Sequence, residues 1–208
     1  MTGVLRRFAL PVAVASARRE ERCELCGTVI PPEHGHLVEL DDRRLLCTCT
    51  ACRLLFTARG AGGGRYRAVS DRYRYQASSP IGPAQWDAAQ IPVSTAFFFQ
   101  NSSLGRMVAF YPSPAGATEC LLGTETCEEI AGADPLFAEL APDVEAVLVT
   151  RNGSGFASYL VPIDACYELV GRIRTHWKGL DGGDEVRTEM DRFFAALRDR
   201  CGVGVADA

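Results

Sequence analysis

The stretches Cys23-Glu-Leu-Cys26-Gly27 and Cys47-Thr-Cys49-Thr-Ala-Cys52 place five cysteines within 30 residues of this chain. Each stretch contains a Cys-x-x-Cys pair, and 22 residues separate the two pairs. This spacing is typical of four-thiolate metal sites, in which the turn of each pair directs both sulfurs at one ion. We therefore predict that one metal ion is bound by Cys23, Cys26, Cys49 and Cys52. Such an ion stabilises a module whose apolar content is too small to fold alone.

The fifth cysteine, Cys47, lies two residues before Cys49. On an extended strand the two side chains face the same side, so Cys47 could replace Cys49 as the fourth ligand. It could also act as a redox or transfer thiol, or be buried. His34 and His36 are further candidate ligands, although exposed positions ahead of a strand are the simpler interpretation of both.

The identity of the metal depends on details around the cysteines, because thiolate tetrahedra accept both zinc and iron. Rubredoxin-type iron sites usually have a glycine after both pairs, which leaves room for backbone amides to reach the sulfurs. Here Gly27 follows the first pair, but Arg53 follows the second. We therefore favour structural zinc and keep iron as the alternative.

The remaining sequence predicts an α+β protein with several parts. The chain has 208 residues, 47% of them hydrophobic, which is enough for one ordinary core and a small satellite module. The predicted parts are a flexible N-terminal lead (1–21), a four-cysteine zinc-ribbon (rubredoxin-like) module (22–75), a linker (76–85), an α+β domain (86–201) and a C-terminal tail (202–208).

Hydrophobic patterns predict the elements of these parts. The module reads as two strands at 36–40 and 43–47. The larger domain reads as strand pairs at 93–99 with 106–111 and at 144–150 with 157–161, and as helices at 124–131, from an N-cap at Asp164 onward, and around 186–197. The order of these elements predicts an antiparallel sheet with helices packed on one face.

Catalytic residues do not come together in the sequence, so we expect the protein not to be an enzyme. Cys166 and His176 are about 15 Å apart along one predicted helix, too far for a hydrogen bond. Asp143 and Glu145 are interpreted as solvated acids or turn caps. A loop rich in proline and glycine, which breaks the second predicted strand, is the best candidate for a rigid partner-binding surface and can equally be a plain strand exit. Its residues are Tyr111, Pro112, Pro114, Gly116 and Glu119.

Charge and cysteine content restrict the class and location of the protein. Residues 1–75 carry 13 arginines against 8 acidic residues, and the rest of the chain carries 9 basic against 18 acidic residues. Four thiolates around a divalent ion reduce the first part from +5 to about +3, which disfavours nucleic acid as a partner. No apolar run approaches the roughly 20 residues of a membrane span. Nine cysteines with Cys-x-x-Cys spacing indicate a reducing, cytoplasmic location.

Several stretches together resemble an uncharacterised bacterial family whose members tend to be encoded beside uptake nickel–iron hydrogenase genes. These stretches are Arg22-Cys23-Glu-Leu-Cys26, Leu46-Cys47-Thr-Cys49-Thr-Ala-Cys52, Ala109-Phe-Tyr-Pro-Ser-Pro-Ala-Gly-Ala-Thr-Glu119, Pro142-Asp-Val-Glu-Ala146 and Val161-Pro-Ile-Asp-Ala-Cys-Tyr-Glu-Leu-Val-Gly171. The resemblance implies a role around hydrogenase, in its assembly or in electron transfer. The architecture is also similar in outline to hydrogenase accessory proteins that pair a rubredoxin-like module with a maturation chaperone.

Together these observations predict a metal-binding accessory protein that acts by protein–protein interaction. Its expected partner is a hydrogenase subunit or a maturation factor. An iron-containing electron-transfer protein is the first alternative, and a nucleic-acid-binding zinc-ribbon protein is the second.

Overall fold

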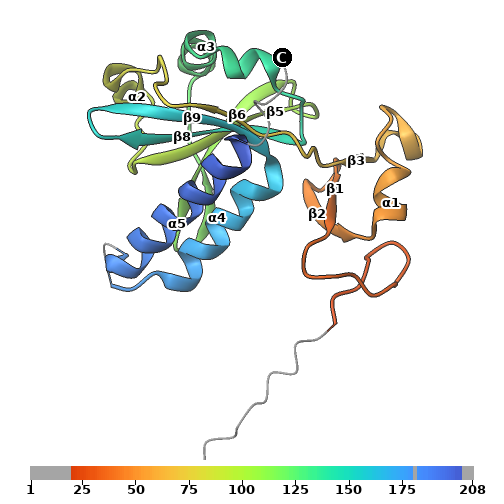
Figure 1. The fold of residues 1–208 in the computed structure, drawn as a ribbon. Helices are drawn as coiled ribbons and strands as arrows, with labels where there is room; N and C mark the ends of the chain where they lie inside the picture. The colour runs from red at the N-terminus through yellow and green to blue at the C-terminus, as the bar shows by residue number, and fades with distance from the viewer. Residues whose placement is uncertain (1–19, 180–181, 203–208) are drawn as a thin grey trace, which may run out of the picture.

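The computed structural model describes residues 20–179 and 182–202 (Figure 1). The predicted N-terminal lead and C-terminal tail therefore fall almost wholly outside the described residues. Within them, a small sheet precedes a larger sheet that is covered by helices. None of the described helices is both long and apolar enough to cross a membrane.

The N-terminal module is built on a three-stranded antiparallel sheet. Its strands are β1 (Gly35–Glu39), β2 (Arg44–Thr48) and β3 (Tyr66–Ala68), in the order β2-β1-β3. The pattern of apolar residues predicted β1 and β2 but not β3, which is only three residues long. The register places His36 directly opposite Cys47.

Two tight turns bring the cysteine pairs toward each other beside this sheet. The first turn is closed by a hydrogen bond from the Gly27 N–H to the Cys23 carbonyl (2.8 Å), and Gly27 has a φ of 75°, which favours glycine. The second pair begins the short helix α1 (Thr50–Leu54), for which Cys49 is the N-cap. A glycine-rich 3₁₀ turn, η2 (Ala61–Gly64), then leads into β3.

The larger sheet has six strands, and every pairing in it is antiparallel. Its order is β4-β9-β8-β5-β6-β7. The strands are β4 (Arg74–Gln76), β5 (Thr95–Asn101), β6 (Arg106–Ser113), β7 (Gly116–Glu119), β8 (Glu145–Asn152) and β9 (Gly155–Pro162). Both predicted hairpins form, and β5 pairs with β8 at the centre of the sheet. The α+β class predicted from the sequence is confirmed.

Helices cover both faces of this sheet, whereas the sequence placed them on one face (Figure 1). The long helices α4 (Ile163–His176) and α5 (Gly183–Gly202) pack on one face, and the short α2 (Pro83–Ala88), α3 (Thr124–Ala133) and η3 (Pro135–Glu139) pack on the other. The reason lies in β5, where Phe97 and Phe99 face the long helices and Phe98 faces the short ones. A strand that is apolar at successive positions needs cover on both faces.

The segment 76–85, predicted as a linker, lies against the sheet. Its Ile81 is buried in the same apolar cluster as Trp86 of α2. The preceding strand β4, placed in the module by the sequence, pairs with β9 of the larger sheet. Because β4 is part of the larger sheet, the larger domain begins before residue 76. The segment that follows packs on the sheet because Ile81 and Trp86 supply apolar side chains.

The module is joined to the larger domain by core packing and by arginines. Val38 and Val69 belong to the same apolar cluster as Phe99 of the larger sheet. The Arg67 guanidinium donates to the Pro142 carbonyl at 2.6 Å. These contacts fix the position of the metal-site module on the sheet.

Candidate metal centre

The two Cys-x-x-Cys pairs meet in one cluster, as their spacing predicts. The Sγ atoms of Cys23, Cys26, Cys49 and Cys52 all lie within 4.8 Å of one another. The Sγ atoms of Cys26 and Cys49 are 3.7 Å apart. A zinc–thiolate tetrahedron with bonds of about 2.3 Å has sulfur–sulfur edges of about 3.8 Å, so this cluster could hold a metal ion with little rearrangement.

Electrostatics inside the cluster favour a cation. Burial opposes ionisation of Cys23, but the backbone amides of Cys49, Cys26 and Leu25 lower its pKa to about 6. Hydrogen bonds with the neighbouring thiols, first Cys49 and then Cys26, raise the pKa of Cys52 to about 12. Four sulfurs this close therefore cannot all ionise together without a positive ion between them.

Short-range hydrogen bonds position the sulfurs of Cys49 and Cys26. The Cys52 N–H donates to the Cys49 Sγ at 3.4 Å, which is an N-cap hydrogen bond made by sulfur. The Cys26 thiol lies 3.4 Å from the Thr28 hydroxyl, and that hydroxyl is the first cause of a lowered Cys26 pKa. The hydroxyl contact stabilises the thiolate of Cys26, which is the form that binds metal.

Cys47 lies outside this cluster, so the geometry places Cys49 rather than Cys47 with the other three sulfurs. Its thiol instead lies close to His34 and His36, with one ligand atom of each within 4.8 Å of the others. Burial, followed by the charges of Glu24 and Glu21, raises the pKa of the Cys47 thiol.

Large apolar side chains around the two cysteine pairs are exposed. Leu54 and Leu55 have 60% and 69% of their surface accessible, and Leu25 and Val29 are also exposed. All four lie within three residues of a cluster cysteine. Phe56 is half-buried and packs edge-on against Tyr66. We call Leu25, Val29, Leu54 and Leu55 the knuckle patch.

The predicted partner-binding loop forms an edge hairpin of the larger sheet. Strand β6 continues through Tyr111 and Pro112, and the chain turns at Pro114 before Gly116 begins β7. Pro112 is buried, Pro114 is exposed, and Glu119 forms a 3.3 Å ion pair with Arg106. The motif ends β6 at Ser113, as the sequence predicted, and it also adds the edge strand β7, which the sequence did not predict.

The acids interpreted as solvated side chains or turn caps are buried, accept hydrogen bonds from loop N–H groups, and pair with arginines of the N-terminal part. Arg67 lies 3.3 Å from Asp143, and Arg72 donates to both carboxylate oxygens of Glu145, at 3.0 and 2.6 Å. Spacing along the chain contains no signal for these pairs, because each joins residues more than 70 positions apart.

Asp164 is also placed differently from the prediction. Helix α4 has Pro162 as its N-cap, and Asp164 lies in the first turn. Its carboxylate contacts Nδ1 of His36 at 2.8 Å. Cys166 is fully buried on the inner face of the same helix, where burial raises its pKa well above that of a free thiol.

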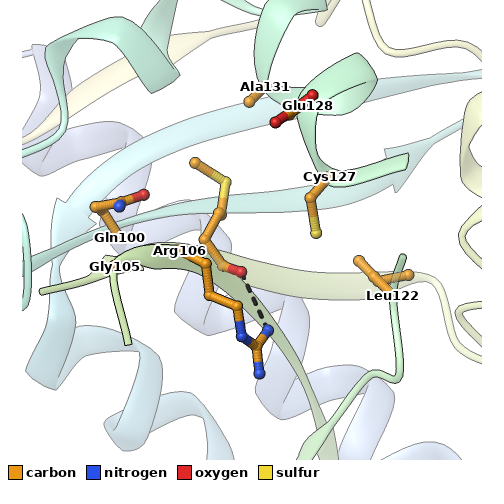
Figure 2. A pocket seen from close by; sticks show the side chains of 8 residues that line it. Gln100, Gly105, Arg106, Leu122, Cys127, Glu128 and Ala131 are labelled. Carbon is orange, nitrogen blue, oxygen red and sulfur yellow. Dashed lines mark hydrogen bonds between the residues drawn. The ribbon is translucent and has the colours of Figure 1, made fainter. Parts of the chain in front are cut away.

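A pocket of about 290 Å³ lies between α3 and the hairpin of β5 and β6 (Figure 2). Its lining includes Cys127, Gln100 and Arg106, whose guanidinium is held by the Met107 carbonyl at 3.4 Å. Burial raises the pKa of the Cys127 thiol, so the side chain is not an activated nucleophile.

Fold and cluster together define an α+β protein with an N-terminal four-cysteine module. The chain belongs to a family of unknown function, DUF5947, whose model matches residues 22–201. Searches of curated proteins and of solved structures found no match. The matched range includes all four cluster cysteines and both sheets.

Proposed function

We propose that this protein is a metal-binding accessory protein that acts through protein–protein contacts, with structural zinc held by Cys23, Cys26, Cys49 and Cys52. The observation that carries the proposal is the knuckle patch. The leucines beside the four-sulfur cluster are left mostly exposed by the residues that the structure describes, and apolar surface of this kind is typical of a docking site. Four sulfurs also complete a tetrahedron, which leaves no coordination position for substrate.

The proposed partner is a nickel–iron hydrogenase subunit or a hydrogenase maturation factor. This part of the proposal rests on the sequence resemblance described above. The edge hairpin around Pro114 would provide a second contact, because its turn is exposed and its backbone is restricted by proline.

Co-purification with hydrogenase components tests this proposal. The variant carrying Leu54→Ser and Leu55→Ser should lose the partner while keeping its metal and its thermal stability. Leu104→Ser is the matched control, because Leu104 is an equally apolar side chain, 50% exposed, outside the module. The proposal is wrong if no hydrogenase component co-purifies with the wild-type protein and deletion of its gene leaves hydrogenase activity unchanged.

Iron-based electron transfer is the second candidate, and the exposure of Cys26 favours it. A metal centre near the surface can exchange electrons with a docked partner. Metal analysis and the visible spectrum of anaerobically purified protein separate the two candidates. A colourless zinc protein supports the accessory role, and one iron with a thiolate charge-transfer band supports electron transfer.

Nucleic-acid binding receives less support from the charges of the module. Many of its arginines are paired with carboxylates of the same chain. They are Arg22, Arg44, Arg53, Arg65, Arg67, Arg72 and Arg74. Paired arginines contribute little to phosphate binding, so a flat salt dependence of any RNA or DNA binding is expected.

A further inference from the structure

A second group of metal-ligand side chains lies beside the four-cysteine cluster. His34 precedes β1, His36 lies within it, and Cys47 is the cross-strand neighbour of His36 on β2. One ligand atom of each side chain lies within 4.8 Å of the other two. Because alternate residues of a strand share a face, this register directs the three side chains to one place.

Both imidazole rings are held through the same nitrogen. His34 Nδ1 lies 2.9 Å from the Pro31 carbonyl, and His36 Nδ1 lies 2.8 Å from the Asp164 carboxylate. A carbonyl and a carboxylate accept hydrogen bonds, so these contacts favour the Nδ1–H tautomer of the neutral ring, in which Nε2 has the lone pair that binds a metal. A ring whose other nitrogen donates to a carboxylate or a carbonyl is the arrangement found in metal-binding histidines.

The free nitrogen of His34 is buried and has no partner among the described residues. The His34 side chain is only 8% exposed, and its Nε2 makes no hydrogen bond with residues 20–179 or 182–202. A buried polar atom without a partner is unfavourable, and native structures seldom keep one unless it has a role. A metal ion would use this lone pair.

The surroundings are electrostatically suited to a cation. His34 and His36 line a cleft of about 550 Å³ between the module and the larger domain. The charged residues that line it are four carboxylates, of Glu33, Asp71, Asp164 and Glu168, and two guanidinium groups, of Arg172 and Arg200. Arg53 pairs with Asp71 at 2.6 Å and Arg172 pairs with Glu168 at 2.7 Å, so the remaining charges leave a small negative excess, which favours cations.

We propose that His34, His36 and Cys47 bind a divalent ion of the zinc class as its three protein ligands, beside this cleft. Two imidazoles and one thiolate are a ligand set that zinc prefers, and three protein ligands with one open position distinguish an exchangeable or reactive site from a structural one. Tetrahedral ligand edges of about 3.3–3.8 Å require the three side chains to approach one another by roughly 1 Å. This site is separate from the four-cysteine cluster and does not depend on the proposed partner.

Zinc content at saturation tests the proposal. Full-length protein is dialysed against excess Zn²⁺, freed of unbound ion, and analysed for zinc per chain. The wild-type protein should hold two ions, and His34→Asn, His36→Asn and Cys47→Ser should each hold one. Asparagine keeps an amide N–H near the position of Nδ1, so the hydrogen bonds to Pro31 and Asp164 can persist while the Nε2 ligand is lost. The ion retained in the four-cysteine cluster reports that the module is folded.

His176→Asn is the matched control, because it changes the one remaining histidine of the chain, whose Nδ1 contacts the Arg172 carbonyl. This variant should hold two ions. A second readout is the rate of alkylation of Cys47 in the wild-type protein, which Zn²⁺ should slow at least tenfold. The proposal is overturned if the three variants hold as many zinc ions as the wild-type protein, or if Zn²⁺ leaves the alkylation of Cys47 unchanged.

Discussion

Arg72 contacts both oxygens of the Glu145 carboxylate, with Nη2 2.6 Å from Oε2 and Nε 3.0 Å from Oε1. Arg72 lies two residues before β4, and Glu145 begins β8, so this pair links the segment that enters the large sheet to a central strand. The Ala141 N–H also donates to Glu145, at 2.8 Å. The Glu145 side chain is only 2% exposed, and these hydrogen bonds compensate for the burial of its charge.

Replacing Glu145 with glutamine should destabilise the fold by about 2 kcal/mol, because charge-assisted hydrogen bonds in a buried site are lost. Chemical denaturation measures the loss. Glu139→Gln is the matched control: Glu139 also pairs with Arg72, but at 3.7 Å and with 40% of its side chain exposed. This control should cost less than about 1 kcal/mol. An equal loss of unfolding free energy in both variants would contradict the conclusion that the buried pair stabilises the fold more than the exposed pair.

The same carboxylate should make stability depend on pH. Burial opposes ionisation of Glu145, but the Arg72 guanidinium and the Ala141 N–H hold its pKa below the ordinary 4.5. A carboxyl whose pKa is lower in the folded state contributes stability above its unfolded pKa, and the contribution is lost as pH falls through the folded pKa. Glu39, which accepts a hydrogen bond from Arg65, also has a lowered pKa, so its contribution to stability is likewise lost as pH falls.

The measurement is the free energy of unfolding of wild type and Glu145→Gln at neutral pH and at progressively more acidic pH. The difference between the two proteins should be constant at neutral pH and shrink below about pH 4.5. Comparing the two proteins removes the effect of metal loss in acid, which both share. A difference that grows as pH falls would contradict the sign of the shift.

Cys49 and Cys47 should differ as metal ligands. Cys49→Ser removes one sulfur of the four-cysteine cluster and should abolish chelator-resistant metal binding, with loss of structure in the module. Cys47→Ser should retain the resistant ion, because its sulfur lies outside that cluster. Metal analysis after mild chelation compares them. Loss of the resistant ion in Cys47→Ser alone would place the fourth ligand at Cys47.

Two adjacent glycines of η2 should respond differently to alanine. Gly62 has a φ of 59°, and a Cβ built there would lie 2.5 Å from Cε1 of Phe56. Gly63 has a φ of 73°, but a Cβ there meets no atom within 4 Å. Both variants incur the left-handed backbone cost of about 1–2 kcal/mol, and only Gly62→Ala adds the displacement of the Phe56 ring, worth about 1–3 kcal/mol. Thermal denaturation should show the lower midpoint for Gly62→Ala.

Local patterns predicted much of this fold. The Cys-x-x-Cys spacing brought Cys23, Cys26, Cys49 and Cys52 together because each pair is closed by a turn of a few residues, whose geometry is set within the motif. The hairpins β5–β6 and β8–β9 followed from alternation and from turn residues such as Asn152-Gly153. The short strands β3, β4 and β7 were missed, since three or four residues give too weak a pattern.

The sequence by itself determined which residues form the four-cysteine cluster, the two hairpins and the long helices, because each depends on neighbours within a turn or a strand pair. Only the tertiary structure decided that Glu145 pairs with Arg72 and that Asp164, 128 residues along the chain, orients His36. Contacts at such separations form when two apolar surfaces pack, here the module against the larger sheet through Val38, Val69 and Phe99. No local spacing encodes them, because their geometry is set by that packing.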